Sequence, residues 1–207
     1  MSNYINKLSA TLRKVNCMLL LMRGNHDDPA YFQDEKIDFP LMKTIPDYSV
    51  IWFGGHNILC VGGATSIDRF QRQTSMWLAS LKGNNESKCY WENEAPIFNP
   101  VSLFELVSGN IQIDSVVTHS APSFCMPTTK SGVEAWIQHD NALADDLDRE
   151  RAIIDELYNR LVQDGNPLTN WFYGHYHDSY TEYISGIRFQ MLDIMELYQL
   201  CEHPATM

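Results

Sequence analysis

Three apolar stretches of this chain each end in a small polar block that presents Asn or His. The first stretch, residues 17–22, leads into Gly-Asn-His-Asp at 24–27. The second, residues 113–118, is followed by His119. The third, residues 171–173, leads into Gly-His-Tyr-His at 174–177. Side chains at the carboxyl ends of neighbouring strands project into one crevice of an open α/β sheet, so the three blocks are expected to meet there. Converging imidazoles and amide oxygens can hold a transition metal such as Zn, Mn or Fe.

The candidate site residues in these blocks carry one amide and four imidazoles. They are Asn25, His26, His119, His175 and His177. Each block alone has a plainer interpretation. A single histidine at the end of a strand is more often a hydrogen-bonded structural residue, and Asn25 can simply form a turn. The ordered trio, with an apolar stretch before each block, favours a common site over three unrelated turns.

Length and composition place the chain among globular proteins. Its 207 residues, 44% of them hydrophobic, suffice for one domain with a sizeable core, and we expect a single domain over 1–207. A net charge of -11 without a Lys/Arg cluster argues against a large nucleic-acid surface. The longest apolar run is far shorter than the roughly 20 residues that span a bilayer. The sequence therefore predicts no membrane span and no extended nucleic-acid partner.

Cysteine usage and the first residues indicate a cytoplasmic protein. The five cysteines are widely separated and form no Cys-x-x-Cys pair, which favours free thiols in a reducing compartment over a disulfide framework. They are Cys17, Cys60, Cys89, Cys125 and Cys201. Residues 1–7 lack the charged and apolar regions of a secretory signal.

Hydrophobic periodicity predicts the order of helices and strands. An amphipathic helix is expected first, from the spacing of Ile5, Leu8, Leu12 and Val15. Residues 17–22 are apolar throughout, typical of a parallel strand covered on both faces. The other expected strands are 50–53, 57–61, 113–118, 171–173, 180–184 and 187–192, and the other helices are 101–107 and 141–161. Residues 30–47 are expected to be a loop with one helical turn, and 71–100 a long surface loop. This order predicts a mixed α/β fold with two sheets packed face to face.

The three blocks resemble the calcineurin-like metallophosphoesterases. Their pattern runs Asp-x-His, Gly-Asp-x-x-Asp, Gly-Asn-His-Asp/Glu, a lone His and Gly-His-x-His, and its last three members match 24–27, His119 and 174–177. The first two members do not appear. Residues 62–69, with Trp91-Glu92, resemble a bacterial or phage-type subgroup. The resemblance implies a four-layer α/β/β/α sandwich with two mixed sheets, truncated at its amino terminus by the first βαβ portion.

The resemblance also implies roles for the site residues. Asn25, His119 and His175 resemble ligands of the second metal ion, and His177 a ligand of the first. His26 resembles the residue that contacts the phosphate and protonates the leaving oxygen, a role that suits an imidazole. The family's activity is phosphoester hydrolysis with two divalent ions, Mn, Fe or Zn, which polarise the ester and activate water.

Four further residues have weaker expectations attached to them. Asp27 is expected to orient the loop or a ligand imidazole. Arg23 resembles a residue of a structural ion pair. Arg69 and Arg72 are each expected at the surface, with phosphate binding as the alternative. The remaining histidines, which have no motif around them, are expected in surface or structural positions; they are His56, His139 and His203.

The two missing blocks would supply the acidic ligands, so a complete two-metal site is not expected from this chain alone. The chain then represents an amino-terminally shortened enzyme or a relative that has lost catalysis. The alternatives are a non-catalytic interaction module and a single-zinc domain held by His119, His175 and His177. The missing strands would also leave residues 17–22 uncovered, which predicts self-association through that strand.

Overall fold

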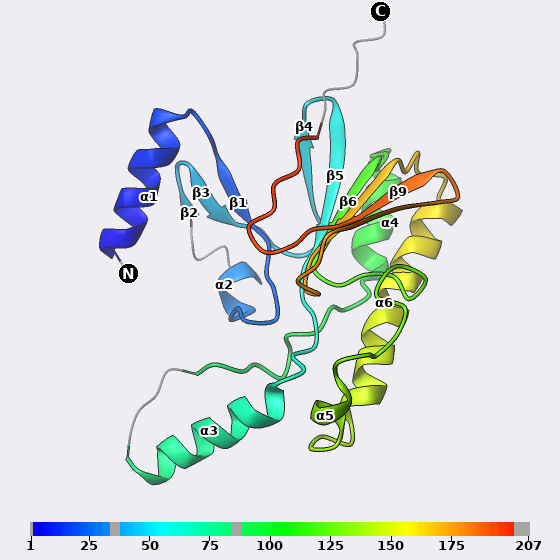
Figure 1. The fold of residues 1–207 in the computed structure, drawn as a ribbon. Helices are drawn as coiled ribbons and strands as arrows, with labels where there is room; N and C mark the ends of the chain where they lie inside the picture. Colours follow the sequence, from blue (N-terminus) through cyan, green and yellow to red (C-terminus); the bar gives the residue numbers. More distant parts are fainter. Residues whose placement is uncertain (1, 34–37, 84–87, 201–207) are drawn as a thin grey trace, which may run out of the picture.

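The computed structural model describes residues 2–33, 38–83 and 88–200 of the chain, with side chains from Lys7 onward. Over these residues the fold is α/β, with six helices and two mixed sheets (Figure 1). None of the helices in this part of the chain is long and apolar enough to cross a membrane.

The smaller sheet has three strands in the order β1-β3-β2. Parallel pairing joins β1 to β3, and antiparallel pairing joins β2 to β3. The elements of this amino-terminal region are α1 (Ser2–Lys14), β1 (Leu19–Leu21), α2 (Ala30–Gln33), β2 (Asp38–Phe39) and β3 (Met42–Thr44). Because Arg23 and the Gly-Asn-His-Asp block follow β1, this sheet positions the first part of the candidate site.

The larger sheet has six strands in the order β4-β5-β6-β7-β9-β8. They are β4 (Ser49–Phe53), β5 (His56–Val61), β6 (Ser115–Thr118), β7 (Asn170–Tyr173), β9 (Ile187–Met191) and β8 (Tyr180–Ile184). The inner strands β5, β6, β7 and β9 run parallel, so their carboxyl ends share one edge. The predicted hairpins β4–β5 and β8–β9 are confirmed, and left-handed Gly54 and Gly55 form the first turn.

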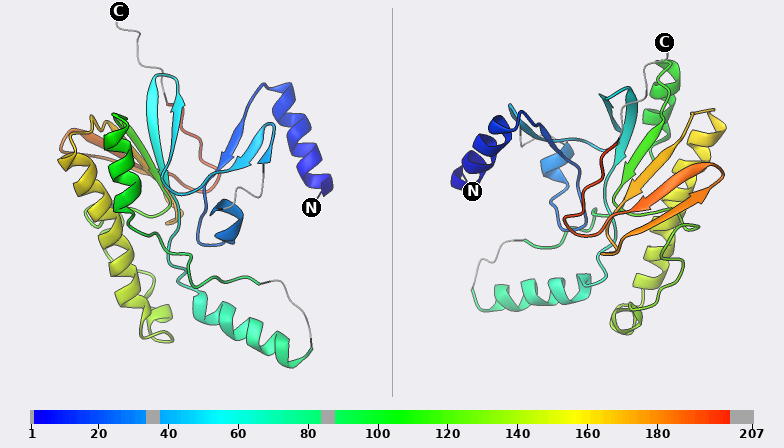
Figure 2. Two further views of the ribbon diagram at one scale, coloured as in Figure 1. Left: turned by 180° about the vertical axis from the view of Figure 1, so that it is seen from behind. Right: turned by 45° about the horizontal axis from the view of Figure 1, so that its top comes forward.

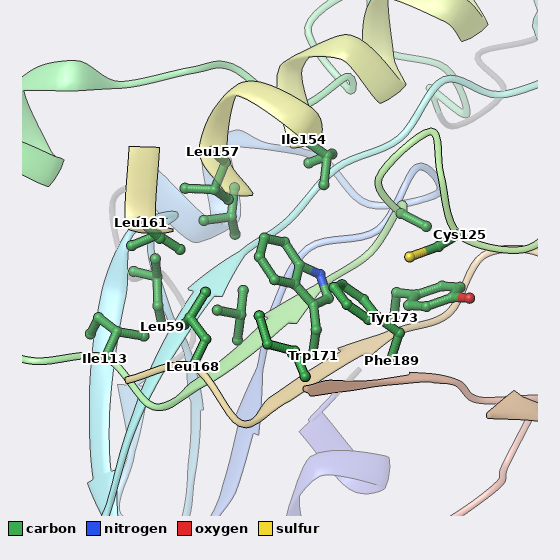
Figure 3. Close-up of a cluster of buried hydrophobic side chains, with 14 of the residues drawn as sticks. Leu59, Ile113, Cys125, Ile154, Leu157, Leu161, Leu168, Trp171, Tyr173 and Phe189 are labelled. Atoms are coloured by element: carbon green, nitrogen blue, oxygen red, sulfur yellow. The ribbon is translucent and has the colours of Figure 1, made fainter. Parts of the chain in front are cut away.

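Two helices cover one face of the six-stranded sheet. These are α4 (Pro100–Ser108) and α6 (Leu143–Gln163), which lie together beside the strands in both views of Figure 2. Figure 3 shows the core between the helices and the sheet, where Ile154 and Leu157 of α6 face Trp171 and Phe189 of the sheet. Trp171 and Phe189 are fully buried. Burial of such side chains contributes about 1.5–3 kcal/mol each, so this layer is the most stable part of the fold.

The amino-terminal predictions are confirmed in type but not in extent. Helix α1 forms and buries Leu12, whereas Val15 lies beyond the helix and is 65% exposed; the side chain of Ile5 falls outside the described part. Strand β1 is only three residues long and half-buried, and Met18 before it is 52% exposed. The expectation of full cover on both faces is wrong, because all three residues of β1 are only half-buried. Strand β1 is also at the edge of its sheet and pairs with β3 alone.

The two predicted loops contain regular structure. Residues 30–47 hold strands β2 and β3 besides the helical turn α2. Residues 71–100 were expected to be loop throughout, but α3 (Arg69–Leu81) occupies their first part and stands away from both sheets (Figure 1). The loop-forming residues of this window begin only at Gly83, and residues 69–81 contain neither Gly nor Pro. The composition of the whole window therefore concealed the helix. A short helix, α5 (Glu134–Ile137), was also not expected.

Candidate functional site

A pocket of about 380 Å³ lies at the carboxyl ends of β6 and β7. The five candidate site residues from all three blocks line it: Asn25, His26, His119, His175 and His177. The rest of the wall is largely apolar and includes Met22, Val117, Phe172, Leu192 and Ile194. The structure thus brings together side chains that lie up to 152 positions apart in the sequence, from Asn25 to His177.

The Gly-Asn-His-Asp block is a closed loop that lies against His119. The carboxylate of Asp27 accepts a hydrogen bond of 2.7 Å from the backbone N–H of Gly24, which agrees with the loop-orienting role expected for Asp27. A Cβ atom at Gly24 would lie only 3.0 Å from Cε1 of His119. Glycine at this position therefore lets the imidazole approach the loop closely. Asn25, which is buried, has its Oδ1 3.1 Å from Nε2 of His119.

Backbone contacts join the second block to the third. Gly174 donates its N–H to the carbonyl of His119 at 3.2 Å, and Tyr176 donates to the carbonyl of Gly174 at 2.9 Å. His175 and His177 both have left-handed backbone, with φ of 72° and 54°. Such backbone costs on the order of 1 kcal/mol or more per residue and is often found at functional sites. The turn directs both imidazoles into the pocket instead of continuing strand β7.

Two of the imidazoles lie close to each other and are uncharged at neutral pH. The ring centroids of His119 and His175 are 5.1 Å apart. Desolvation lowers the pKa of His119 to about 4 and that of His175 to about 3, and the neighbouring histidines and Arg151 lower the pKa of His175 further. Neutral imidazole is the form that binds a metal ion, so both rings already have the required protonation state.

His26 lies at the exposed side of the pocket beside an arginine of α3. Burial lowers the pKa of His26, and the charge of Arg72 lowers it further. The Nη2 of Arg72 is 2.6 Å from a ring nitrogen of His26, while its Nε donates to Asp68 at 2.8 Å. The side chain of Arg72 is only 11% exposed, so the expected surface position is wrong for this residue.

Arg69 also differs from the expectation of a surface position. Its side chain is 12% exposed and forms ion pairs with Asp140 at 2.6 Å and Asp146 at 2.7 Å. Neither Arg69 nor the two aspartates line the pocket. The two ion pairs hold α3 against the start of α6, so Arg69 has a structural role here and not a ligand-binding one.

Arg23 attaches the first block to the rest of the site. It forms an ion pair of 2.7 Å with Asp47, which confirms the structural ion pair expected for it. Its Nη1 donates to the carbonyl of Glu94 at 2.6 Å, and the carbonyl of Arg23 accepts from Gly63 at 3.0 Å. A Cβ at Gly63 would lie 2.5 Å from Nη1 of Arg23, and one at Gly62 would lie 2.5 Å from the Arg23 carbonyl. Both glycines are therefore required for this approach.

A second buried contact holds the side chain of Asn25. Its Nδ2 donates to Oγ of Ser66 at 3.0 Å, and Ser66 in turn donates to the carboxylate of Glu94 from its N–H at 2.6 Å and its Oγ at 2.9 Å. Sequence reasoning marked Ser66 and Glu92 only as parts of a resemblance and missed Glu94. No local pattern distinguishes Glu94 from its neighbours, because its partner is 28 residues away.

A second acid that was not predicted, Glu150, could have been recognised from its place in the sequence. It accepts hydrogen bonds from the N–H of Thr65 and the hydroxyl of Ser120, and the same hydroxyl lies 2.9 Å from the Tyr176 hydroxyl. Glu150 is buried, and burial raises its pKa. It continues the spacing of the apolar face of α6, between Leu147 and Ile154. A charged residue on the buried face of a helix indicates a specific partner.

The other histidines take structural positions. His56 is buried and pairs with Asp114 at 2.6 Å, whereas His139 is exposed and stacks on Phe70 with the ring centroids 6.3 Å apart. These positions agree with the expectation of surface or structural roles, and His203 lies outside the described residues.

The pocket residues fit one metal ion better than two. Asn25, His119 and His175 provide an amide oxygen and two neutral imidazoles that lie close together, a set that suits one borderline ion. Across residues 2–33, 38–83 and 88–200, no group of three His, Cys, Asp or Glu side chains is placed to hold an ion. A two-ion centre would need carboxylates in addition to this set.

No protein-family model matches the chain, and no curated protein matches it either.

Proposed function

We propose that the chain is a metal-dependent phosphoester hydrolase of the calcineurin-like type. One observation carries the proposal: the five residues that resemble this family's site line a single pocket, although they come from three separate blocks. Under this proposal the fold is the family's four-layer sandwich. The six-stranded sheet with α4 and α6 would form two layers, and the three-stranded sheet with α1 would belong to the other two.

Within this proposal, each residue has a distinct task. Asn25, His119 and His175 hold one divalent ion, with Mn, Fe or Zn as the candidates. When bound, the ion neutralises phosphoryl charge and supplies an activated water. His26 lies at the open side and donates a proton to the leaving oxygen. Arg72, beside His26, has a guanidinium that suits phosphate oxygens.

A second candidate is an interaction module that binds an ion or a phosphorylated partner without hydrolysis. The observation that favours it is the neutral ligand set, since Asn25, His119 and His175 include no carboxylate. The nearby carboxylate of Asp27 is already engaged by the N–H of Gly24. A site of this kind binds a dication less tightly than one with acidic ligands.

The two candidates are separated by measuring metal binding and turnover on the same samples. The purified chain is titrated with Mn²⁺ and then assayed with p-nitrophenyl phosphate and bis(p-nitrophenyl) phosphate. For the hydrolase, His26→Ala should lower turnover by roughly 10²–10⁴-fold while Mn²⁺ binding remains. His175→Ala should remove both, and His139→Ala, at an exposed histidine outside the pocket, should change neither. Mn²⁺ binding without turnover would support the interaction module, and no Mn²⁺ binding would contradict the hydrolase.

A further inference from the structure

Glu94 is a buried carboxylate that does not line the pocket yet is connected to it through one residue. It is 2% exposed and accepts two hydrogen bonds from Ser66, which is fully buried. Ser66 in turn contacts the side chain of Asn25. The carboxylate, the hydroxyl and the amide form a chain of contacts that ends at His119.

The number of protons along this chain fixes the direction of each hydrogen bond. A hydroxyl has one proton to donate, and a carboxylate only accepts. The charged Oε2 of Glu94, at 2.9 Å, is a stronger acceptor for the Ser66 proton than the Asn25 carbonyl at 3.3 Å. With its proton directed to Glu94, Oγ of Ser66 can only accept from Asn25. The group of Asn25 that faces Ser66 must then be the amide nitrogen.

This direction determines what Asn25 presents to the pocket. Its Nδ2 lies 3.0 Å from Oγ of Ser66, and its Oδ1 lies on the side of His119, at 3.1 Å from Nε2. A carboxamide turned by 180° would present two N–H donors, which repel a cation. The orientation of this amide therefore decides whether Asn25 can act as a ligand.

We propose that Glu94 is a positioning residue that, through Ser66, holds the oxygen of the Asn25 carboxamide toward the pocket. The importance of that oxygen for metal binding rests on the proposed function, whereas the orientation itself does not. Arg23 fixes the other end of the arrangement, because it precedes Asn25 by two residues and donates to the carbonyls of Glu94 and Ala95 at 2.6 and 3.1 Å. The loop with Asn25 and the segment with Glu94 are thus held together at two points.

The orientation is tested first in the metal-free protein by NMR. Spectra are recorded at pH 8, because burial raises the pKa of Glu94 to about 7 and the carboxylate form is required. The side-chain amide of Asn25 is identified by its loss in Asn25→Asp. In the wild type this amide should show NOEs to Ser66 and slow exchange with water. Glu94→Gln, which can donate to Ser66 and free its hydroxyl proton, should abolish both signatures.

The same variants are then compared in Mn²⁺ binding. Glu94→Gln and Ser66→Ala should each weaken binding by about 10–100-fold, the usual effect of removing a group that orients a ligand. Glu92→Gln is the matched control, because Glu92 is an exposed acid in the same segment, and it should behave as the wild type. Ser66→Ala also serves if Glu94→Gln does not fold.

Several results would overturn the proposal. A wild-type Asn25 amide without NOEs to Ser66 would contradict the orientation directly. A Glu94→Gln variant that melts at a lower temperature but keeps the Asn25 amide signal and Mn²⁺ affinity would show a purely structural role. If the wild type binds no Mn²⁺, the proposed function fails, but the amide spectra of the metal-free protein still decide the role of Glu94.

Discussion

The six-stranded sheet and the amino-terminal region are held by different kinds of contact. The sheet buries large apolar side chains under α4 and α6, and Trp171, Phe189 and Ile154 are fully buried there. In the amino-terminal region, β1 is half-buried and Met18 is 52% exposed. The Asn25 loop is nevertheless held firmly against the sheet by polar contacts. Stability and the candidate site therefore have separate origins in this molecule.

Among the residues that the structure describes, the polar contacts between the two regions converge on one short segment. Arg23 binds Asp47, Glu94 and Ala95, and Asn25 binds Ser66 and His119; these contacts are made by side chains. The backbone of Arg23 adds a hydrogen bond from Gly63. Polar contacts give direction as well as attachment, so this segment can orient an amide, which apolar packing alone cannot do.

The largest expected effect on stability is in the apolar core of the six-stranded sheet. Trp171→Ala should destabilise the protein by about 3–5 kcal/mol, because it leaves a cavity under α6 and removes the hydrogen bond from its Nε1 to Thr118. Urea unfolding measures the change. Trp77→Ala is the control, since Trp77 is 60% exposed on α3, and should cost under about 0.5 kcal/mol. Equal losses for both variants would contradict the assignment of the core.

A smaller and more local effect is expected when the polar contacts of Arg23 are removed. Arg23→Ala leaves the Asp47 carboxylate and two carbonyls without their charged donor, at a cost of about 2–3 kcal/mol. Hydrogen exchange should accelerate in residues 17–44 while β6 and β7 remain protected. Arg149→Ala, at an exposed ion pair with Asp146, is the control and should stay within about 0.5 kcal/mol of the wild type. Uniform acceleration across the chain would show that the two regions are not separable.

The free energy of unfolding should also depend on pH through Glu94, in a defined direction. Burial raises the pKa of Glu94 from 4.5 to about 7, so the folded state binds its proton more tightly than the unfolded chain. Between these values stability should fall as pH rises, by on the order of 2 kcal/mol for this group. The measurement is the difference between wild type and Glu94→Gln in unfolding free energy from pH 4.5 to 8. A difference that is constant across this range would contradict the assignment.

The smallest perturbation that distinguishes exposed from buried parts of the molecule is chemical modification of its thiols. Cys17, before β1, is exposed, whereas Cys60 in β5 is buried and burial raises its pKa to about 12. Cys89 is exposed and Cys125 buried, with a raised pKa. At pH 8, a thiol reagent should modify Cys17 and Cys89 within minutes and Cys60 and Cys125 only after unfolding. Peptide mass spectrometry reads each site, and rapid labelling of Cys60 in the folded protein would contradict the packing of β5.

The sequence predicts those features that repeat locally. The hairpin at Gly54-Gly55, helix α6 and the strands before His119 and His175 follow from apolar period and turn residues, and the structure confirms them. The rule that neighbouring parallel strands share their carboxyl ends accounts for the blocks after β6 and β7. It does not account for the block after β1, because β1 belongs to the other sheet. Such rules need only short segments of sequence and the general geometry of sheets.

What the sequence does not predict depends on distant partners. Strands β2 and β3 are two and three residues long, too short for alternation to appear. Glu94 is distinguished only by Ser66 and Arg23, neither of which is near it in the sequence. Arg72 was placed at the surface because its contact with His26 depends on where α3 lies. Glu150, by contrast, was detectable as a charge on the apolar face of α6.

The proposed function requires that the Asn25 loop and the six-stranded sheet together bind one ion. A Mn²⁺ titration followed by electron paramagnetic resonance tests this claim most directly. The wild type should bind about one ion per chain, with hyperfine coupling to the nitrogens of His119 and His175. Asn25→Ala, His119→Ala and His175→Ala should each abolish this binding, and His139→Ala should not. Mn²⁺ that stays bound in all three pocket variants, or a wild type that binds none, would contradict the claim.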